Sequence, residues 1–323
     1  MLKLLALDRF TILLFVMVVL ASFVPVAGQA AVLFGQLTTV AIAILFFLHG
    51  AKLSREAVRS GLLNWKLHSV VFIFTFALFP ILGLMSKPIL LPLLGQELYW
   101  GVLFLCCLPS TVQSSIAFTS VAKGNVAGAV CSASFSNLVG MFITPILVSL
   151  LILGQAQHNF DPTESIIQIT LLLLVPFVLG QLLRPWVFPV MQKLPKLVKC
   201  FDQGSILMVV YGAFSSAVVA GLWQQVGLST LFILIFVCSV LLTVVMVLAL
   251  WVPKWLGFNQ ADQRTIFFCG SKKTLASGVP MAQILFIGQP LGMLVLPIMI
   301  FHQIQLMVCG VIANYWSKKT DTE

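Results

Sequence analysis

Apolar runs of about 20 residues alternate with short polar segments along the whole chain, and this pattern predicts membrane-spanning helices. A helix rises about 1.5 Å per residue, so about 20 apolar residues cross a hydrocarbon core about 30 Å thick. The runs do not alternate with a period of two, which excludes an outer-membrane barrel. Ten runs can be read: Phe10–Ala27, Val32–Gly50, His68–Met85, Tyr99–Val121, Val126–Leu153, Ile166–Leu183, Ser205–Leu222, Leu228–Trp251, Thr265–Ile287 and Gly292–Tyr315.

Composition agrees with an all-α polytopic membrane protein. Apolar residues make up 60% of the 323 positions and charged residues 8%, whereas a soluble chain carries about 25% charged residues. The net charge of +9 comes from short loops between the runs, so we expect no nucleic-acid partner. The sequence contains no nucleotide-binding loop, metal cluster or catalytic triad, so we expect neither an enzyme nor an ATP-driven pump, and no cofactor.

The positive charges predict the orientation of these helices. With the N-terminus inside, 15 of the 18 lysine and arginine residues fall on the cytoplasmic side and only Lys87 falls outside. Lys272 and Lys273, the remaining two, lie within an apolar run. Since cytoplasmic loops are enriched in Lys and Arg, this split predicts ten helices in the cytoplasmic membrane (the inner or plasma membrane) with both termini cytoplasmic. None of the nine acidic residues falls inside an expected span.

The fourth and ninth runs share a spacing that suggests an internal repeat. Cys269 and Ser277 follow Cys107 and Ser115 by the same 162 positions. Each half of the chain has five runs, an odd number, so the second half would be inverted relative to the first. We therefore expect two five-helix repeats.

The repeat places a boundary near the middle of the chain. We assign residues 1–155 to the first repeat and 156–323 to the second, with the polar segment Gly154–Thr163 between them.

Two adjacent lysines in the ninth run form the most unusual feature of the sequence. Lys272 lies about 12 Å into the run, and a charge at that depth costs about 3 kcal/mol unless water, partners or broken backbone surround it. Gly270, Gly278 and Pro280 flank the pair and favour a helix that breaks in mid-membrane. Interrupted helices are typical of solute sites in transporters, although lysines can also snorkel or pair with a neighbour.

The fourth run carries a matching polar stretch, in which five of the seven residues from Pro109 to Ser115 are Ser, Thr or Gln. Such side chains can simply bond back to the preceding turn, but opened backbone there would offer carbonyls to cations and amides to anions. A crossing of the two runs would place neutral dipoles beside ammonium groups, which suits a carboxylate, sulfate or phosphate on an organic body. We expect the substrate or ion site to comprise Gln113, Ser114, Ser115, Ser271, Lys272, Lys273, Thr274 and Ser277, with Thr111, Asn125, Asn137 and His302 as secondary candidates. His302 could relay protons or be a hydrogen-bonded structural residue.

Several motifs resemble the bile acid:sodium symporter (SBF-like) family. They are Cys106-Cys107, Ser114-Ser115, Ala122–Ala127, Phe46–Arg55 and Cys269–Lys273. The last two are similar to the branch that holds its bacterial members and the vertebrate seventh member of solute carrier family 10. The resemblance implies ten helices in inverted repeats, a core domain with discontinuous, crossing helices 4 and 9, and a panel domain of spans one, two, six and seven. It also implies transport of organic anions by rocking of the two domains.

The chain departs from the family at the positions that the resemblance implies for sodium. Sodium-coupled members carry Asn where this chain has Ile116, hydroxyl side chains where it has Ala129 and Ala133, Glu at Ser271 and Gln at Leu275. A site that loses its carboxylate and several oxygens should not hold sodium in the same way. Sodium therefore stays open as a co-substrate, and its ligands are undefined. Our hypothesis is that Lys272 or Lys273 replaces the bound cation, orients the substrate or exchanges a proton.

These features together predict a secondary active transporter of a small organic anion, a solute:sodium symporter as the family implies, working by alternating access in a lipid bilayer. One alternative is a sodium-independent, proton-coupled transporter or cation/proton antiporter that uses Lys272 and Lys273. The other is a non-transporting membrane regulator, for example of calcium entry, as is implied for the vertebrate relative. The oligomeric state is left open.

Overall fold

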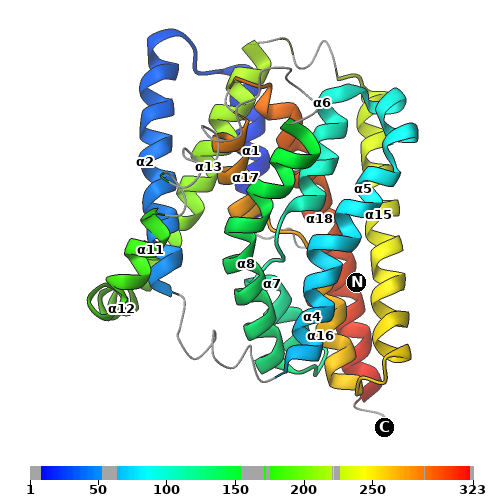
Figure 1. The fold of residues 1–323 in the computed structure, drawn as a ribbon. Helices are drawn as coiled ribbons and strands as arrows, with labels where there is room; N and C mark the ends of the chain where they lie inside the picture. The colour runs from blue at the N-terminus through cyan, green and yellow to red at the C-terminus, as the bar shows by residue number, and fades with distance from the viewer. Residues whose placement is uncertain are drawn as a thin grey trace.

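The computed structural model describes residues 9–52, 64–153, 171, 175–219, 221, 226–286 and 288–320, and all regular structure within these ranges is helical. The expected linker, Gly154–Thr163, and residues 166–170 and 172–174 of the sixth expected span, Ile166–Leu183, lie outside the described residues. The elements of Figure 1 are α1 (Arg9–Phe23), α2 (Gly28–Lys52), α4 (Trp65–Ile73), η2 (Phe74–Leu78), α5 (Phe79–Met85), α6 (Lys87–Cys107), α7 (Gln113–Val121), α8 (Val126–Val148), η3 (Ser149–Leu153), α11 (Val175–Leu182), α12 (Arg184–Lys193), α13 (Pro195–Val219), α15 (Leu228–Trp255), α16 (Gln260–Gly270), α17 (Leu275–Leu285) and α18 (Leu291–Thr320).

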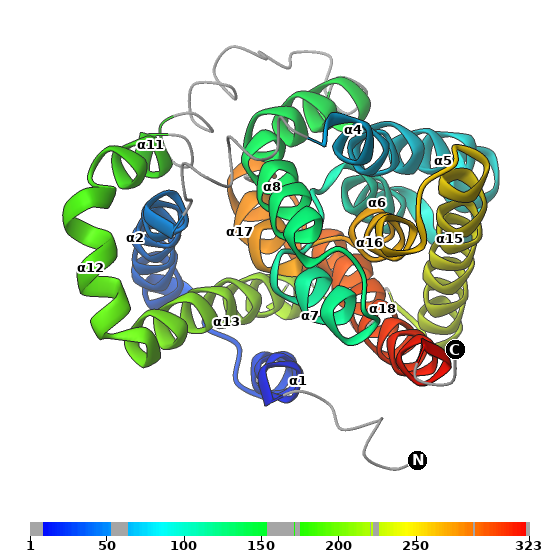
Figure 2. The same ribbon diagram turned by 90° about the horizontal axis from the view of Figure 1, so that it is seen from below.

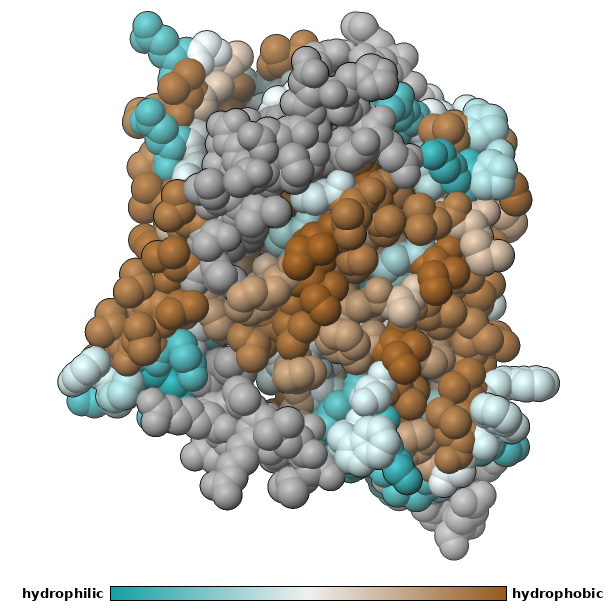
Figure 3. All heavy atoms as spheres, in the orientation of Figure 1, coloured by the Kyte–Doolittle hydropathy of each residue, from teal (hydrophilic) through white to brown (hydrophobic). Residues whose placement is uncertain are grey.

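Seven stretches of helix in the described chain are long and apolar enough to cross a membrane, and Ile12–Phe23 adds a shorter apolar helix. Apolar side chains form a band across the middle of the molecule, and hydrophilic ones gather toward its two ends (Figure 3). Large apolar side chains such as Phe232 and Trp251 are more than two-thirds exposed, as residues facing lipid tails should be. The prediction of a polytopic, all-α membrane protein is confirmed, whereas the count of ten spans and the inverted repeat stay predictions.

The helices fall into two groups in the view of Figure 2. On one side α2 packs against α11 and α13, with α12 beside α2 and α1 against α13. On the other side lie α4 to α8 and α15 to α18. Helix α13 contacts both α17 and α18, so it joins the first group to the second.

Close contact between α2 and α11 depends on two glycines. A Cβ atom added at Gly50 would overlap the carbonyl oxygen of Phe177, and one at Gly180 would overlap the carbonyl oxygen of Phe47. Each glycine thus faces the carbonyl that lies three positions before the other glycine. Small residues let helix backbones approach closely within a membrane, and here the approach leaves no room for a Cβ atom at either glycine.

Two of the predicted spans, the fourth and the seventh, begin clearly earlier in the structure, and the break expected in the ninth is present. The fourth begins at Lys87 rather than Tyr99, because Pro88 starts a helix that continues through a kink at Gly95. The seventh begins at Pro195 rather than Ser205, so Cys200 is a helical residue. The ninth is interrupted between Gly270 and Leu275. Proline fits the first turn of a helix because it has no N–H to lose there.

All seven cysteines lie in the described chain, and none of them forms a disulfide there. Six of them are buried, and Cys200 is exposed on α13. Buried cysteines outside disulfides behave as small hydrophobic residues.

Candidate functional site

The two interrupted helices meet at their breaks. Helix α6 ends at Cys107 and α7 begins at Gln113, while α16 ends at Gly270 and α17 begins at Leu275. The Thr274 amide donates to the carbonyl of Pro109 over 3.0 Å, and the Ser110 hydroxyl donates to the carbonyl of Cys269 over 2.6 Å. Buried backbone groups released by a break need partners, and each break supplies them to the other.

Helix α8 is hydrogen-bonded through Asn137 to the junction, the place where the two breaks meet. The Asn137 amide nitrogen donates to the carbonyl of Ser110 over 3.2 Å. Its side-chain oxygen accepts from the Ser277 hydroxyl over 3.3 Å. Ser136 accepts from the Ser110 amide over 3.1 Å. Asn137 therefore contacts both breaks at once, and its position decides how they align.

A cavity of about 540 Å³ opens beside the junction. Its apolar wall includes Phe10, Leu138, Met141, Phe177, Ile206 and Leu306. Its polar lining consists of Thr111, Gln113, Ser114, Thr274 and Ser277 at the breaks, Ser134 and Asn137 on α8, His49 and Lys52 on α2, Lys199, Asp202 and Gln203 on α13, and His302 on α18. Seven of the twelve candidates from the sequence thus lie around one hollow.

Residues at the N-termini of two half-helices, α7 and α17, line this cavity. Thr274 caps α17, its hydroxyl accepting from the Ser277 amide over 3.5 Å. At the start of α7 the Thr111 hydroxyl lies 2.7 Å from that of Ser114 and 3.1 Å from that of Ser115. Helix N-termini carry partial positive charge and free amides, so the junction favours negative groups.

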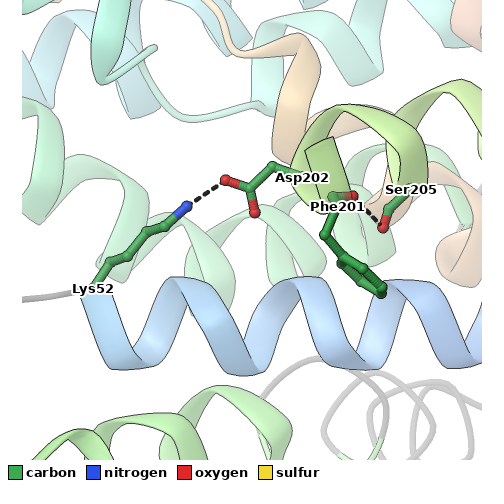
Figure 4. Close-up of polar contacts among 4 residues, drawn as sticks. All are labelled: Lys52, Phe201, Asp202 and Ser205. Carbon is green, nitrogen blue, oxygen red and sulfur yellow. Dashed lines mark hydrogen bonds and ion pairs between the residues drawn. The ribbon is translucent and has the colours of Figure 1, made fainter. Parts of the chain in front are cut away.

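Three charged side chains also line the cavity, and the sequence analysis missed them as site residues. The Lys52 ammonium donates to Asp202 and joins α2 to α13 (Figure 4). Lys199 is the third, leaving one positive charge in excess. All three lie outside the spans expected from the sequence, but α2 reaches Lys52 and α13 begins at Pro195. The signal available was the position of Asp202, three residues before an apolar run.

Lys272 and Lys273 were expected in the substrate or ion site, but neither of them lines the cavity. Both side chains are fully buried. Lys273 donates to three backbone carbonyls, and the Lys272 ammonium lies over the rings of Phe118, at 4.0 Å, and Phe268, at 5.5 Å. The chain passes between α16 and α17 without helical turns, so the break turns both side chains away from the hollow.

Three further candidates also lie outside the cavity lining. The Ser115 hydroxyl donates to the carbonyl of Phe268 over 3.1 Å, and Ser271 donates back to Phe267 over 2.6 Å. Asn125 caps α8 and donates to Asp262 over 2.7 Å. His302 does line the cavity, and its Nδ1 lies 2.8 Å from the Gln305 amide nitrogen. These contacts give Ser115, Ser271 and Asn125 structural roles in this conformation.

The positions implied for sodium do not fit that ion. Ala129 and Ala133 are buried without side-chain oxygens, Leu275 is buried, and the Ser271 hydroxyl is engaged by a carbonyl. Within the described chain no group of three or more His, Cys, Asp or Glu side chains could hold a metal ion. A bound sodium would therefore need ligands other than those of the resemblance.

Replacing Lys272 by Met is expected to leave the unfolding temperature unchanged or to raise it by a few degrees. The Lys272 ammonium has no hydrogen-bond partner among the described residues, and a buried charge exchanged for an apolar side chain of similar size is often neutral or stabilising. Methionine also packs well on aromatic rings. Thermal unfolding of purified protein measures the change. An equal loss in Lys272→Met and Lys273→Met would contradict the expectation.

Comparison with known proteins identifies the family. A model described as the SBF-like CPA transporter family matches residues 8–318. The Pseudomonas aeruginosa protein PA2026 is 52% identical over 97% of this chain and 94% of its own length. "Putative symporter YfeH" of Escherichia coli is 51% identical over 98% and 94%, and "Sodium/bile acid cotransporter 7" of Danio rerio is 29% identical over 85% and 82%. The chain is therefore a membrane transport protein and belongs to the SBF-like CPA transporter family.

Proposed function

We propose that the protein is a secondary transporter that carries an organic anion across the cytoplasmic membrane by alternating access. The observation that carries the proposal is the convergence of two half-helix N-termini, at Gln113 and Leu275, on one cavity. The hydroxyl and amide side chains there can donate to an anion. Half-helix N-termini that face a cavity are a recurrent way for transporters to bind anionic groups.

The cavity lining favours an anion with an apolar body. A volume of about 540 Å³ falls within the range of small-molecule sites. The charged and polar residues would bind the acidic group of the substrate. The apolar wall, which includes Met141, Ile206 and Leu306, would contact its apolar body. Several relatives carry the name sodium/bile acid cotransporter, which agrees with a carboxylate or sulfonate on a large apolar body.

The position of the cavity suits alternating access. Helices α2 and α13 supply one wall, and α8, α17 and α18 supply the other. A rocking movement between these groups would expose the junction to each side in turn. The charge split along the sequence places Lys52 and Lys199 on the cytoplasmic side. We therefore propose that this conformation opens inward, with both termini cytoplasmic.

Coupling to sodium finds less support than transport itself. Ile116, Ala129, Ala133 and Leu275 carry no oxygen in their side chains, so the expected ligand set is incomplete. These replacements favour coupling to protons, or transport down the gradient of the anion, over sodium symport at that site.

Neutralising Lys199 is expected to weaken anion binding by about 5- to 10-fold, because one of two ammonium groups leaves the cavity. The first test is thermal unfolding of wild type, Lys199→Gln and Lys196→Gln with a panel of organic carboxylates and sulfonates that includes taurocholate. Lys196 lies on the same helix but does not line the cavity, so it is the matched control. Anions that stabilise the wild type are then tested for uptake into proteoliposomes.

Two results would count against the proposal. If no anion in the panel stabilises the wild type and none is taken up, the regulatory alternative gains. If Lys196→Gln weakens binding as much as Lys199→Gln, surface charge rather than the cavity accounts for the effect.

A further inference from the structure

Two irregularities in neighbouring helices release backbone carbonyls toward one point. The wide turn η2 interrupts the helix from Trp65 to Met85, and such turns leave a carbonyl without its usual partner. Helix α6 ends at Cys107, so its last carbonyls have no amide to accept from in the next turn. The Thr144 hydroxyl satisfies the carbonyl of Cys107 over 2.8 Å. The carbonyls of Thr75, Cys106 and Leu108 remain for another donor.

The Lys273 ammonium takes all three of these carbonyls. Its nitrogen lies 2.7 Å from each of the oxygens of Thr75, Cys106 and Leu108, and an ammonium group has three N–H donors to give. The ring of Phe79 lies 4.2 Å from the same nitrogen and adds a cation–π contact. We call these three carbonyls, together with the Phe79 ring, the carbonyl cage.

The backbone of Lys273 is also fixed. Its amide donates to the Gln305 side-chain oxygen over 2.9 Å, and the Gln305 side-chain nitrogen donates to its carbonyl over 2.8 Å. Both residues are fully buried. The lysine therefore enters the carbonyl cage from a backbone held on both sides by Gln305, and its side chain has no contact with solvent in this conformation.

Three converging carbonyls and a ring face are groups that bind monovalent cations in proteins. We propose that the carbonyl cage is a cation site that the chain fills with its own lysine, so that the charge another transporter would take from solution is built in. The comparison of this charge with a coupling ion rests on the proposed transport function, whereas the cation site itself does not depend on it. It predicts that removal of the side chain opens the site to a small external cation.

The test compares three variants in matched salts at constant ionic strength. Lys273→Ala empties the carbonyl cage, Lys273→Met keeps it filled with an apolar chain, and Lys272→Ala removes the adjacent ammonium, which no carbonyl contacts in the described structure. The probes are propylammonium and sodium. Propylammonium matches the deleted part of the side chain. Sodium would bind the three carbonyls, and water molecules can fill its other coordination positions. Choline is the reference, because it has no N–H donor and is too large.

Propylammonium or sodium at about 100 mM is expected to raise the unfolding temperature of Lys273→Ala by about 3 °C over choline. Wild type, Lys273→Met and Lys272→Ala should show no such difference. If Lys273→Ala unfolds on extraction in choline, recovery of monodisperse protein only with propylammonium or sodium is the equivalent positive result.

The inference is overturned if neither cation stabilises or rescues Lys273→Ala. It is also overturned if sodium stabilises wild type and Lys273→Met as much as it stabilises Lys273→Ala. The measurement needs no transported substrate. If the cations do not stabilise Lys273→Ala, the transport proposal still stands. If they do stabilise it but the wild type takes up no anion, the transport proposal fails and the cation site stands.

Discussion

Alanine in place of Gly50 is expected to lower the free energy of unfolding by about 3 kcal/mol or more, a fall of about 8 °C in unfolding temperature. The added methyl group would overlap the carbonyl oxygen of Phe177, which belongs to the backbone of α11 and cannot rotate away. The two helices would have to separate along their whole contact. Thermal unfolding of the purified variant measures the loss.

Gly35 provides the control on the same helix. A Cβ atom there meets nothing within 4 Å, so Gly35→Ala should be neutral or slightly stabilising, because alanine favours helix more than glycine does. Gly180→Ala should repeat the loss, since it meets the carbonyl of Phe47 in the same manner. Equal stability of Gly35→Ala and Gly50→Ala would refute the close contact.

Asn137→Ala should reduce the rate of anion uptake by about 100-fold. The change deletes the hydrogen bonds to Ser110 and Ser277, each worth about 1 to 1.5 kcal/mol, and a loss of about 1.4 kcal/mol corresponds to a tenfold change in rate. The amide aligns both half-helices at the cavity, so the loss falls on the geometry that binds the anion. Initial uptake into proteoliposomes is the measurement.

Two further variants separate alignment from simple loss of a polar group. Ser134→Ala removes a cavity-lining hydroxyl from the same helix and should retain most of the activity. Asn137→Asp keeps the acceptor for Ser277 but adds negative charge to the cavity, so we expect it to be at least as inactive as Asn137→Ala. Normal uptake by Asn137→Ala at unchanged protein level would show that the junction tolerates misalignment.

Much of the architecture was predictable because each membrane-spanning helix requires an apolar run of about 20 residues, which is visible in the sequence. Apolar runs located the spans, and Gly270, Gly278 and the polar stretch before Ser115 indicated where two of them break. The contact of the two breaks was expected from the family resemblance, which implies that helices 4 and 9 cross, and the structure gives its physical reason: each break supplies partners to the buried backbone groups of the other.

The direction of the lysines was not predictable. The angle between successive side chains is about 100° only on a regular helix, and Lys272 and Lys273 lie where the helix has stopped. One of the three carbonyls that hold Lys273, that of Thr75, lies in a wide turn within Phe74–Leu78, and hydropathy does not locate such a turn. The pairing of Lys52 with Asp202 joins residues 150 positions apart. Hydropathy does not report contacts at that separation.

The thiol at Cys200 gives the unmodified chain a natural reporter position. It is the exposed cysteine among seven and lies on α13 between the cavity residues Lys199 and Asp202. A maleimide fluorophore or spin label should therefore attach at one place without first building a cysteine-free background. The label would sit on the helix group proposed to rock, so that substrate-dependent changes in its environment could be followed in the wild-type protein.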